Sequence, residues 1–228
     1  MKNAIILIMI IIVIAGGYVI FSSLTENKIE NNTSAAVPQA VIDQTIKVHG
    51  GDRYSASMIE FDFRDKHYTA RREDGLFTYT RSFADSIGKI KDVLTNQRFK
   101  RTINGLKVQL RERDKRRYAA SVNSVIYFAL LPFPLNDPAV KKRYIGETPI
   151  NGQPYHTIEI TFRKEGGGQD YQDVFAYWIH KTDFTMDYLA YRFHDDGGGT
   201  RFRDAYNPRT INGIRFADYH NYQGPSAD

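Results

Sequence analysis

The chain contains no cysteine among its 228 residues, so no disulfide can form and no lipid can be attached through a lipobox cysteine. Its glycine-rich stretches, residues 166–168 and 197–199, lack the strand-to-helix context of a phosphate-binding loop and instead predict hairpin turns. The six histidines are scattered, with no pair at the spacing of a metal site. We therefore predict a protein that uses no cofactor and no metal.

A strong excess of one charge is also missing. The net charge is +5 and the isoelectric point is about 9.2, values that permit attraction to anionic membranes but do not require it. We predict no nucleic-acid partner. The apolar fraction of 42% and the aromatic fraction of 13% exclude a disordered chain and favour a β-rich one.

One long apolar run stands at the amino terminus. Residues 4–21 carry no charge and are mostly Ile, Leu, Val and Met, which is about the minimum length for crossing a bilayer. Lys2 precedes the run and Glu26 follows it, so the chain is expected to start in the cytoplasm. Residues 1–24 fit both an uncleaved signal-anchor (an N-terminal transmembrane helix) and a removed signal peptide, and both export the remainder.

Residues 25–37 are rich in Asn, Ser, Thr and Glu and show no apolar period, which predicts a flexible tether closed by Pro38. The remainder, residues 38–224, is long enough to bury a core and is predicted to form a single domain.

Short strands dominate this domain. In the second half they are residues 155–163, 173–180, 186–194, 200–206 and 214–222, and in the first half residues 58–63, 67–72, 77–83, 87–95 and 98–110. Asn-Gly pairs at 104–105, 151–152 and 212–213 predict tight hairpins, because both central residues of such turns need positive φ. The connections are too short for crossover helices, so the strands should be antiparallel.

Two helices accompany the strands. Residues 38–49 have a short apolar stripe, and a second helix starting near Asp114 has apolar positions at spacings of three, four and seven. This second helix becomes apolar on all sides before Pro132, which indicates contact all round. The predicted fold is mainly β with helices (α+β): an antiparallel incomplete β-barrel (half-barrel) of about ten strands with the apolar helix over its concave face.

Acidic residues recur among the aromatic residues of the later strands. Asp173, Asp187, Asp204 and Asp218 each share the phase of neighbouring Tyr and Phe residues, so each needs a donor if that phase faces inward. Two interpretations stay open. The carboxylates could form a rim satisfied by Tyr hydroxyls and turn amides, or a polar floor in a ligand cavity with His220 or Asp218 for acid–base work.

Several segments resemble a group of uncharacterised bacterial envelope proteins, many of them described as lipoproteins. They include residues 121–128 (Ser-Val-Asn-Ser-Val-Ile-Tyr-Phe), 177–179 (Tyr-Trp-Ile) and 198–203 (Gly-Gly-Thr-Arg-Phe-Arg). The order of helix, half-sheet, apolar helix and half-sheet is distantly similar to the lipoprotein-carrier (LolA/LolB-like) superfamily. This resemblance implies an incomplete barrel that holds acyl chains and has no catalytic residues, although the lipobox cysteine is missing here.

We therefore predict a non-enzymatic domain, tethered to the inner membrane and facing the periplasm, or secreted there if its leader is removed. It would bind a hydrophobic or lipid-like ligand in a closable apolar pocket. The residues predicted to line that pocket are Tyr127, Phe128, Leu131, Phe175, Tyr177, Tyr191, Phe202 and Phe216. Those predicted at its polar mouth are Arg192, Arg203, Asp204, Asp218 and His220.

Two alternatives stay open beside this prediction. An envelope hydrolase would need an acid–base cluster around Asp173, Asp218 and His220. A structural partner-binding module would instead have a filled interior and an exposed apolar edge.

Overall fold

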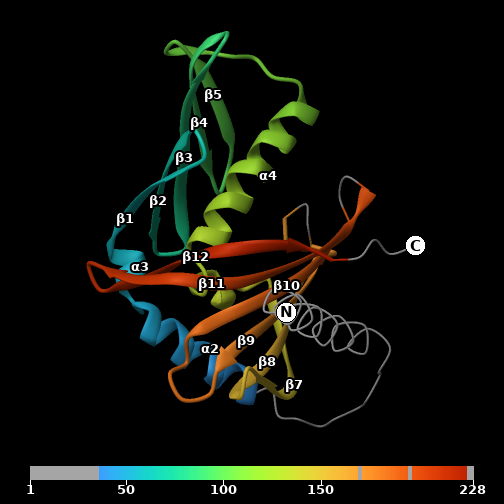
Figure 1. The fold of residues 1–228 in the computed structure, drawn as a ribbon. Coiled ribbons are helices and arrows are strands. Elements are labelled where there is room, and N and C mark those ends of the chain that lie inside the picture. Colours follow the sequence, from blue (N-terminus) through green and yellow to red (C-terminus); the bar gives the residue numbers. More distant parts are fainter. Residues whose placement is uncertain (1–35, 169–170, 195–196, 225–228) are drawn as a thin grey trace, which may run out of the picture. The chain divides into compact units, whose positions relative to one another are not determined.

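The computed structural model describes residues 36–168, 171–194 and 197–224 (Figure 1). The predicted membrane segment and nearly all of the tether lie outside these residues. Across the described ranges, none of the helices has the length and apolar character needed to pass through a bilayer. The described residues fall into two compact units: unit 1 holds residues 36–48, 136–209 and 217–224, and unit 2 holds residues 49–135 and 210–216.

Unit 2 contains a six-stranded antiparallel sheet whose strands pair in chain order. A short helix, α3 (Arg53–Ala56), precedes it. The strands are β1 (Met58–Phe63), β2 (Lys66–Glu73), β3 (Leu76–Asp85), β4 (Gly88–Thr95), β5 (Phe99–Ile103) and β6 (Leu106–Lys107).

The predicted turn chemistry is present in this sheet. Asn104 and Gly105 have φ values of 50° and 83°, and Asp74 and Gly75 have φ values of 49° and 77°. Asn and Asp tolerate this left-handed conformation better than other non-glycine residues, and glycine adopts it at no steric cost. These pairs therefore close the hairpins β5–β6 and β2–β3.

Helix α4 (Glu112–Ala129) packs against β3, β4 and β5 of this sheet (Figure 1). Val122 and Ile126, one turn apart on the helix, are fully buried. They join Tyr54, Tyr68 and Tyr79 in one hydrophobic cluster. The predicted apolar helix is confirmed, and its inner face is in contact with side chains of the sheet.

Unit 1 contains a second antiparallel sheet, in which the strands again pair in chain order. They are β7 (Val140–Ile150), β8 (Gln153–Phe162), β9 (Val174–His180), β10 (Met186–Phe193), β11 (Gly199–Ile211) and β12 (Ile214–Gln223). The hairpin end of β11 and β12, residues 210–216, groups with unit 2.

Helix α2 (Ala36–His49), whose residues to Val48 group with unit 1, lies beside the sheet of that unit (Figure 1). Ile42 and Thr45 of this helix are fully buried, and the Thr45 hydroxyl donates to the Val41 carbonyl oxygen at 2.8 Å. Asp43 of α2 acts on Lys142 of β7: burial lowers the pKa of Lys142, and Asp43 opposes that effect. Lys142 pairs with Ile160, so its interaction with Asp43 places α2 on the side of the sheet that bears Ile160.

The predicted half-barrel of about ten strands is corrected in one respect. The structure has two separate six-stranded sheets, and neither closes on itself. Strand β7 is absent from the predicted set because its polar residues hide the apolar alternation. Strand β11 continues through Pro208 to Ile211. Pro208 is tolerated there because the pairing of β11 with β10 ends at Asp204, so no hydrogen bond to β10 is lost.

We expect Ile126→Ala to destabilise the protein by about 2–5 kcal/mol, because it leaves a cavity under α4. Asn123→Ala, at an exposed position of the same helix, should change stability by less than about 0.5 kcal/mol. Urea unfolding followed by circular dichroism measures both. Equal, small losses for the two variants would contradict the packing described for α4.

Candidate functional site

The two faces of the unit 1 sheet differ in what they contact. Tyr177 pairs with Ile158 and Leu189, and all three side chains are fully buried on the face that α2 covers. Trp178, the next residue, pairs with Thr157 and Tyr188 on the opposite face. We call this opposite face the aromatic face. Its members are Ile150, Tyr155, Thr157, Ala176, Trp178, Tyr188, Ala190, Arg192, Thr200, Phe202 and Asp204.

A β-bulge decides which rings reach the aromatic face. The register of β10 against β9 shifts between Met186 and Tyr188, so Asp187 is the extra residue. The shift brings Tyr188 to the side of Trp178. It also directs Asp187 to that side, where its Oδ2 accepts a hydrogen bond from the Tyr155 hydroxyl at 3.1 Å. The predicted grouping of Asp187 with Leu189 and Tyr191 is therefore wrong.

The rings on the aromatic face contact one another. Phe202 lies 6.1 Å from Trp178 and 6.0 Å from Tyr188, between ring centroids. Tyr155 packs edge-on against Tyr188 at 5.4 Å. Trp178 is only 1% exposed. Burial and the charge of Asp187 raise the pKa of Tyr155, so its hydroxyl stays protonated and serves as a donor.

Four polar atoms beside these rings are buried without a hydrogen-bond partner among the described residues. They are Trp178 Nε1, Arg192 Nε, Thr200 Oγ1 and Asp204 Oδ1. Arg192 pairs with Thr200, and Asp204 pairs with Tyr188, so these polar residues share the face of the ring cluster. A buried polar group without a partner costs about 1–3 kcal/mol. This arrangement therefore favours a bound molecule that supplies donors and acceptors.

The predicted pocket residues do not share one surface. Phe175, Tyr177 and Tyr191 lie on the α2 side of the unit 1 sheet, because Tyr191 pairs with Phe175 after the bulge. Phe202 lies on the aromatic face, opposite Ala190. The other four, Tyr127, Phe128, Leu131 and Phe216, belong to unit 2.

The described surface depressions do not involve the predicted pocket residues either. One, of about 310 Å³, is bordered by residues that include Ser55, Arg71 and Glu73. The other, of about 170 Å³, is bordered by residues that include Lys100, Arg101 and Lys115.

The predicted polar mouth is also divided between the two faces. Arg192 and Asp204 belong to the aromatic face. Arg203 belongs to the other, where its Nη2 donates to the Tyr191 hydroxyl at 3.0 Å. Near the edge of the sheet, His220 Nδ1 lies 3.1 Å from Asp204 Oδ2, so His220 contacts the aromatic face through this carboxylate.

The three residues of the hydrolase alternative have separate partners. Asp218 accepts from Asn207 at 2.8 Å and pairs with Arg209 at 2.9 Å. The hydrogen bond from Asn207, aided by Arg209, lowers the pKa of Asp218, so it is ionised at neutral pH. Asp173 instead accepts from the backbone N–H of His194 at 3.2 Å. In the described part of the chain, no group of acidic and histidine side chains has the arrangement of a metal site.

Sequence reasoning missed Tyr155, Trp178, Tyr188 and Thr200 as candidate site residues. Trp178 stands in a motif that the sequence already singled out, and it is the single tryptophan of the chain. The apolar pattern on both sides of β9 is the signal that could have found it, because a strand buried on both faces reads as a continuous hydrophobic run.

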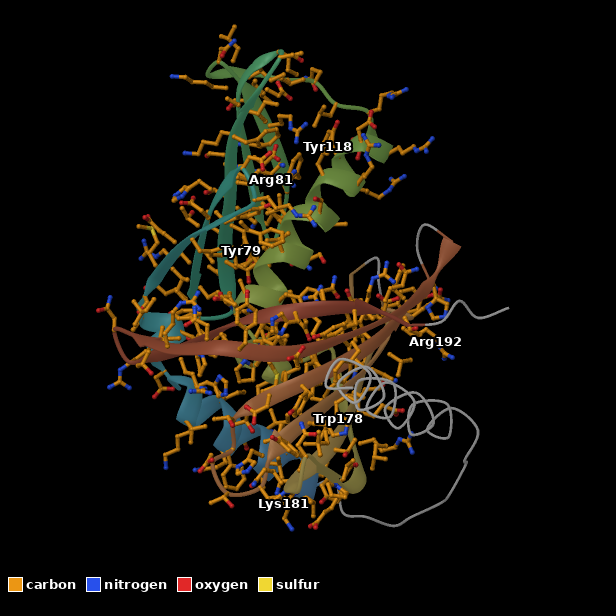
Figure 2. The ribbon with its side chains drawn as sticks, in the orientation of Figure 1. Tyr79, Arg81, Tyr118, Trp178, Lys181 and Arg192 are labelled. Carbon is orange, nitrogen blue, oxygen red and sulfur yellow. The ribbon has the colours of Figure 1, made fainter. Side chains whose placement is uncertain are left out.

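Unit 2 holds a buried ionic network under α4 (Figure 2). Asp92 is fully buried and accepts from Arg81 at 2.7 and 3.0 Å and from Arg101 at 2.7 and 2.9 Å. Arg81 also donates to the Ser121 hydroxyl at 2.8 Å, and Arg101 lies 3.7 Å from the Tyr118 ring centroid. Burial alone would lower the pKa of Arg101, but its hydrogen bonds and charge interaction with Asp92 outweigh this and raise it.

The fold and these sites define an α+β protein of two antiparallel sheets, with one ring-lined face in unit 1. A family model matches residues 22–226, so the chain belongs to the family of unknown function DUF6503. No match to the chain was found among curated protein sequences.

Two solved structures are similar to the chain. A DUF1329 family protein from Desulfovibrio piger ATCC 29098 is 12% identical with a TM-score of 0.43, covering 82% of this chain and 86% of that one. A LolA superfamily protein from Nitrosomonas europaea is 9% identical with a TM-score of 0.45, covering 84% and 94%. At such scores the likeness carries no argument about function. The family match confirms the predicted resemblance to an uncharacterised family.

Asp92→Asn should destabilise the protein by about 3–5 kcal/mol, because it leaves two buried guanidinium groups without a full counter-charge. Asp62→Asn removes an exposed carboxylate from the same sheet and should cost less than about 1 kcal/mol. Urea unfolding distinguishes the two. A loss for Asp92→Asn no larger than that of Asp62→Asn would contradict the structural role of the network.

His49 gives a pH-dependent prediction. Its pKa is lowered to about 4, mainly by burial and also by the charge of Arg215. As pH falls below about 6.5, the ordinary pKa of histidine, His49 becomes protonated in the unfolded chain but stays neutral in the folded chain. The free energy of unfolding therefore decreases toward pH 4, by about 3 kcal/mol in total.

The comparison of His49→Gln with His67→Gln, an exposed control, isolates this effect. Unfolding free energies measured near about pH 7 and about pH 4.5 should differ less in His49→Gln than in the wild type. His67→Gln should keep the wild-type dependence. Identical pH dependence in all three proteins would refute the assignment.

Proposed function

We propose that this protein binds a hydrophobic or lipid-like ligand on the aromatic face of unit 1 and acts without catalysing a reaction. One observation carries the proposal: a buried ring cluster adjoins four buried polar atoms that lack partners among the described residues. Of the described helices, α2 is the one that belongs to unit 1, and it lies on the opposite face. A ligand at the border of this buried ring cluster would satisfy the polar atoms.

The side chains suggest how such a ligand would be held. Tyr188 and Phe202, the partly buried rings beside Trp178, offer apolar surface for an acyl chain or a flat apolar group. Arg192 is the cation among the four polar residues, so it would bind an anionic head group such as a carboxylate or a phosphate. Thr200, opposite Arg192, adds a hydroxyl that can donate to the same group.

The expected location follows from the amino terminus. A signal-anchor over residues 1–24 would place the domain of residues 38–224 in the periplasm, at the surface of the inner membrane. A tether of thirteen residues spans at most about 45 Å when extended, so the domain would stay close to lipid. Removal of the leader would release the same domain into the periplasm.

Trp178 makes a direct test possible, because its fluorescence is the only tryptophan signal of the chain. The full-length protein is transferred from detergent into an amphipathic polymer and titrated with a brominated fatty acid and a brominated phosphatidylglycerol. Bromine quenches indole fluorescence on contact. We expect saturable quenching. The ligand that binds with higher affinity shows whether the anionic group is a fatty-acid carboxylate or a lipid phosphate.

Matched variants separate head-group binding from non-specific quenching. Arg192→Gln should weaken binding of the anionic ligand about tenfold or more, because a hydrogen bond from a charged group is lost. Binding of a brominated fatty alcohol should not change. Arg203→Gln, on the opposite face of the same strands, should leave both unchanged. Absence of quenching, or equal effects of the two substitutions, would overturn the proposal.

A further inference from the structure

One end of the unit 2 sheet consists of three successive hairpin turns. They connect β1 to β2, β3 to β4, and β5 to β6. Each turn carries a large apolar side chain in solvent: Phe63 is 45% exposed, Ile87 59% and Leu106 75%. A single exposed apolar residue is ordinary, but one on every turn of the same sheet end marks an interaction surface. We call these three residues the apolar tips.

Two of the turns are fixed to each other by hydrogen bonds. The backbone N–H of Asn104 donates to the Lys89 carbonyl oxygen at 2.8 Å, and the Lys89 N–H donates to Asn104 Oδ1 at 2.9 Å. Gly88 has a φ of 128°, and a Cβ there would lie 2.5 Å from the Asn104 side chain. The turns that carry Ile87 and Leu106 are therefore held side by side (Figure 1).

The β1–β2 turn is connected to β3 by a cation–π contact of Lys66. Lys66 Nζ lies 5.1 Å from the ring centroid of Phe83 on β3. Arg64, in the same turn, lies over the ring of Phe63 at 5.2 Å. One tip, Phe63, is therefore in direct contact with a cation, and the turns also contain Asp65 and Asp85.

Basic residues are concentrated in the part of unit 2 that adjoins the tips. Residues 89–117 contain eleven Lys and Arg but three Asp and Glu, whereas the whole chain has a net charge of only +5. The three acids are engaged locally: Asp92 is buried between two arginines, Glu112 pairs with Lys115, and Asp114 pairs with Arg111.

Seven of the remaining basic residues form an exposed collar. They are Lys89, Lys91, Lys100, Lys107, Arg113, Arg116 and Arg117. Arg98 lies apart, in the β4–β5 turn at the opposite end of the sheet. The field of this collar attracts an anionic surface.

We propose that this end of unit 2 docks on an anionic lipid bilayer. Phe63, Ile87 and Leu106 would enter the boundary between head groups and acyl chains, and the collar would contact phosphate groups. A bilayer supplies both the apolar phase and the negative charge that these side chains require. An acidic protein surface would supply the charge alone. This proposal concerns residues separate from the aromatic face, so it stands independently of ligand binding there.

The absence of cysteine makes a site-specific probe simple to introduce. Leu106→Cys is labelled with an environment-sensitive fluorophore in the full-length protein, which is then reconstituted into vesicles of phosphatidylcholine with or without phosphatidylglycerol. Leu76→Cys is the matched control. Leu76 is 65% exposed in the β2–β3 turn, at the opposite end of the same sheet.

We expect the label at position 106 to brighten about twofold or more and shift to the blue in anionic vesicles, with the signal reduced by high salt. The label at position 76 should change little. Ile87→Asp in the Leu106→Cys background should reduce the response, and circular dichroism of that variant checks that it is folded. Equal responses at the two positions, or no dependence on phosphatidylglycerol, would overturn the proposal.

Discussion

Side-chain alternation in the antiparallel sheets is the constraint from which both sheets and the candidate site derive. In unit 1, one phase of β8, β9 and β10 packs beneath α2, and the other phase supplies the rings of the aromatic face. The bulge at Asp187 resets this alternation within one strand. Without it, Tyr188 would lie on the α2 side, and Phe202 would lose a stacking partner.

Charged side chains with buried atoms have different hydrogen-bond partners in the two units. In unit 2, Asp92 receives four hydrogen bonds from two arginines, and a network satisfied in this way serves the packing of α4 on its sheet. In unit 1, Arg192 keeps a buried Nε without a partner among the described residues, next to Thr200. A buried donor without a partner is costly, so this contrast supports our proposal that Arg192 belongs to a ligand site, whereas Asp92 belongs to a structural ion network.

Local chemistry made much of the fold predictable. The Asn-Gly turns, both main helices and most strand positions follow from patterns of a few residues. The faces of the strands were harder, because a residue's side depends on the register with its partner and on bulges that composition does not mark. Asp92 illustrates this: it shares a strand face with Ile90 and Leu94, just as Asp204 shares one with Phe202. Only the strand pairing reveals that Arg81 and Arg101 flank the first carboxylate.

The two proposed surfaces would bind lipid through different interactions, and their affinities should depend differently on salt concentration. Arg192 acts as one partly buried cation beside rings, and screening by dissolved ions is weak in such a setting. The collar next to the apolar tips is an exposed set of cations, whose attraction to a charged bilayer falls steeply as ionic strength rises. A ligand held by the aromatic face would therefore persist at a salt concentration that releases the tips, because charge is secondary to ring contact in the first case and decisive in the second.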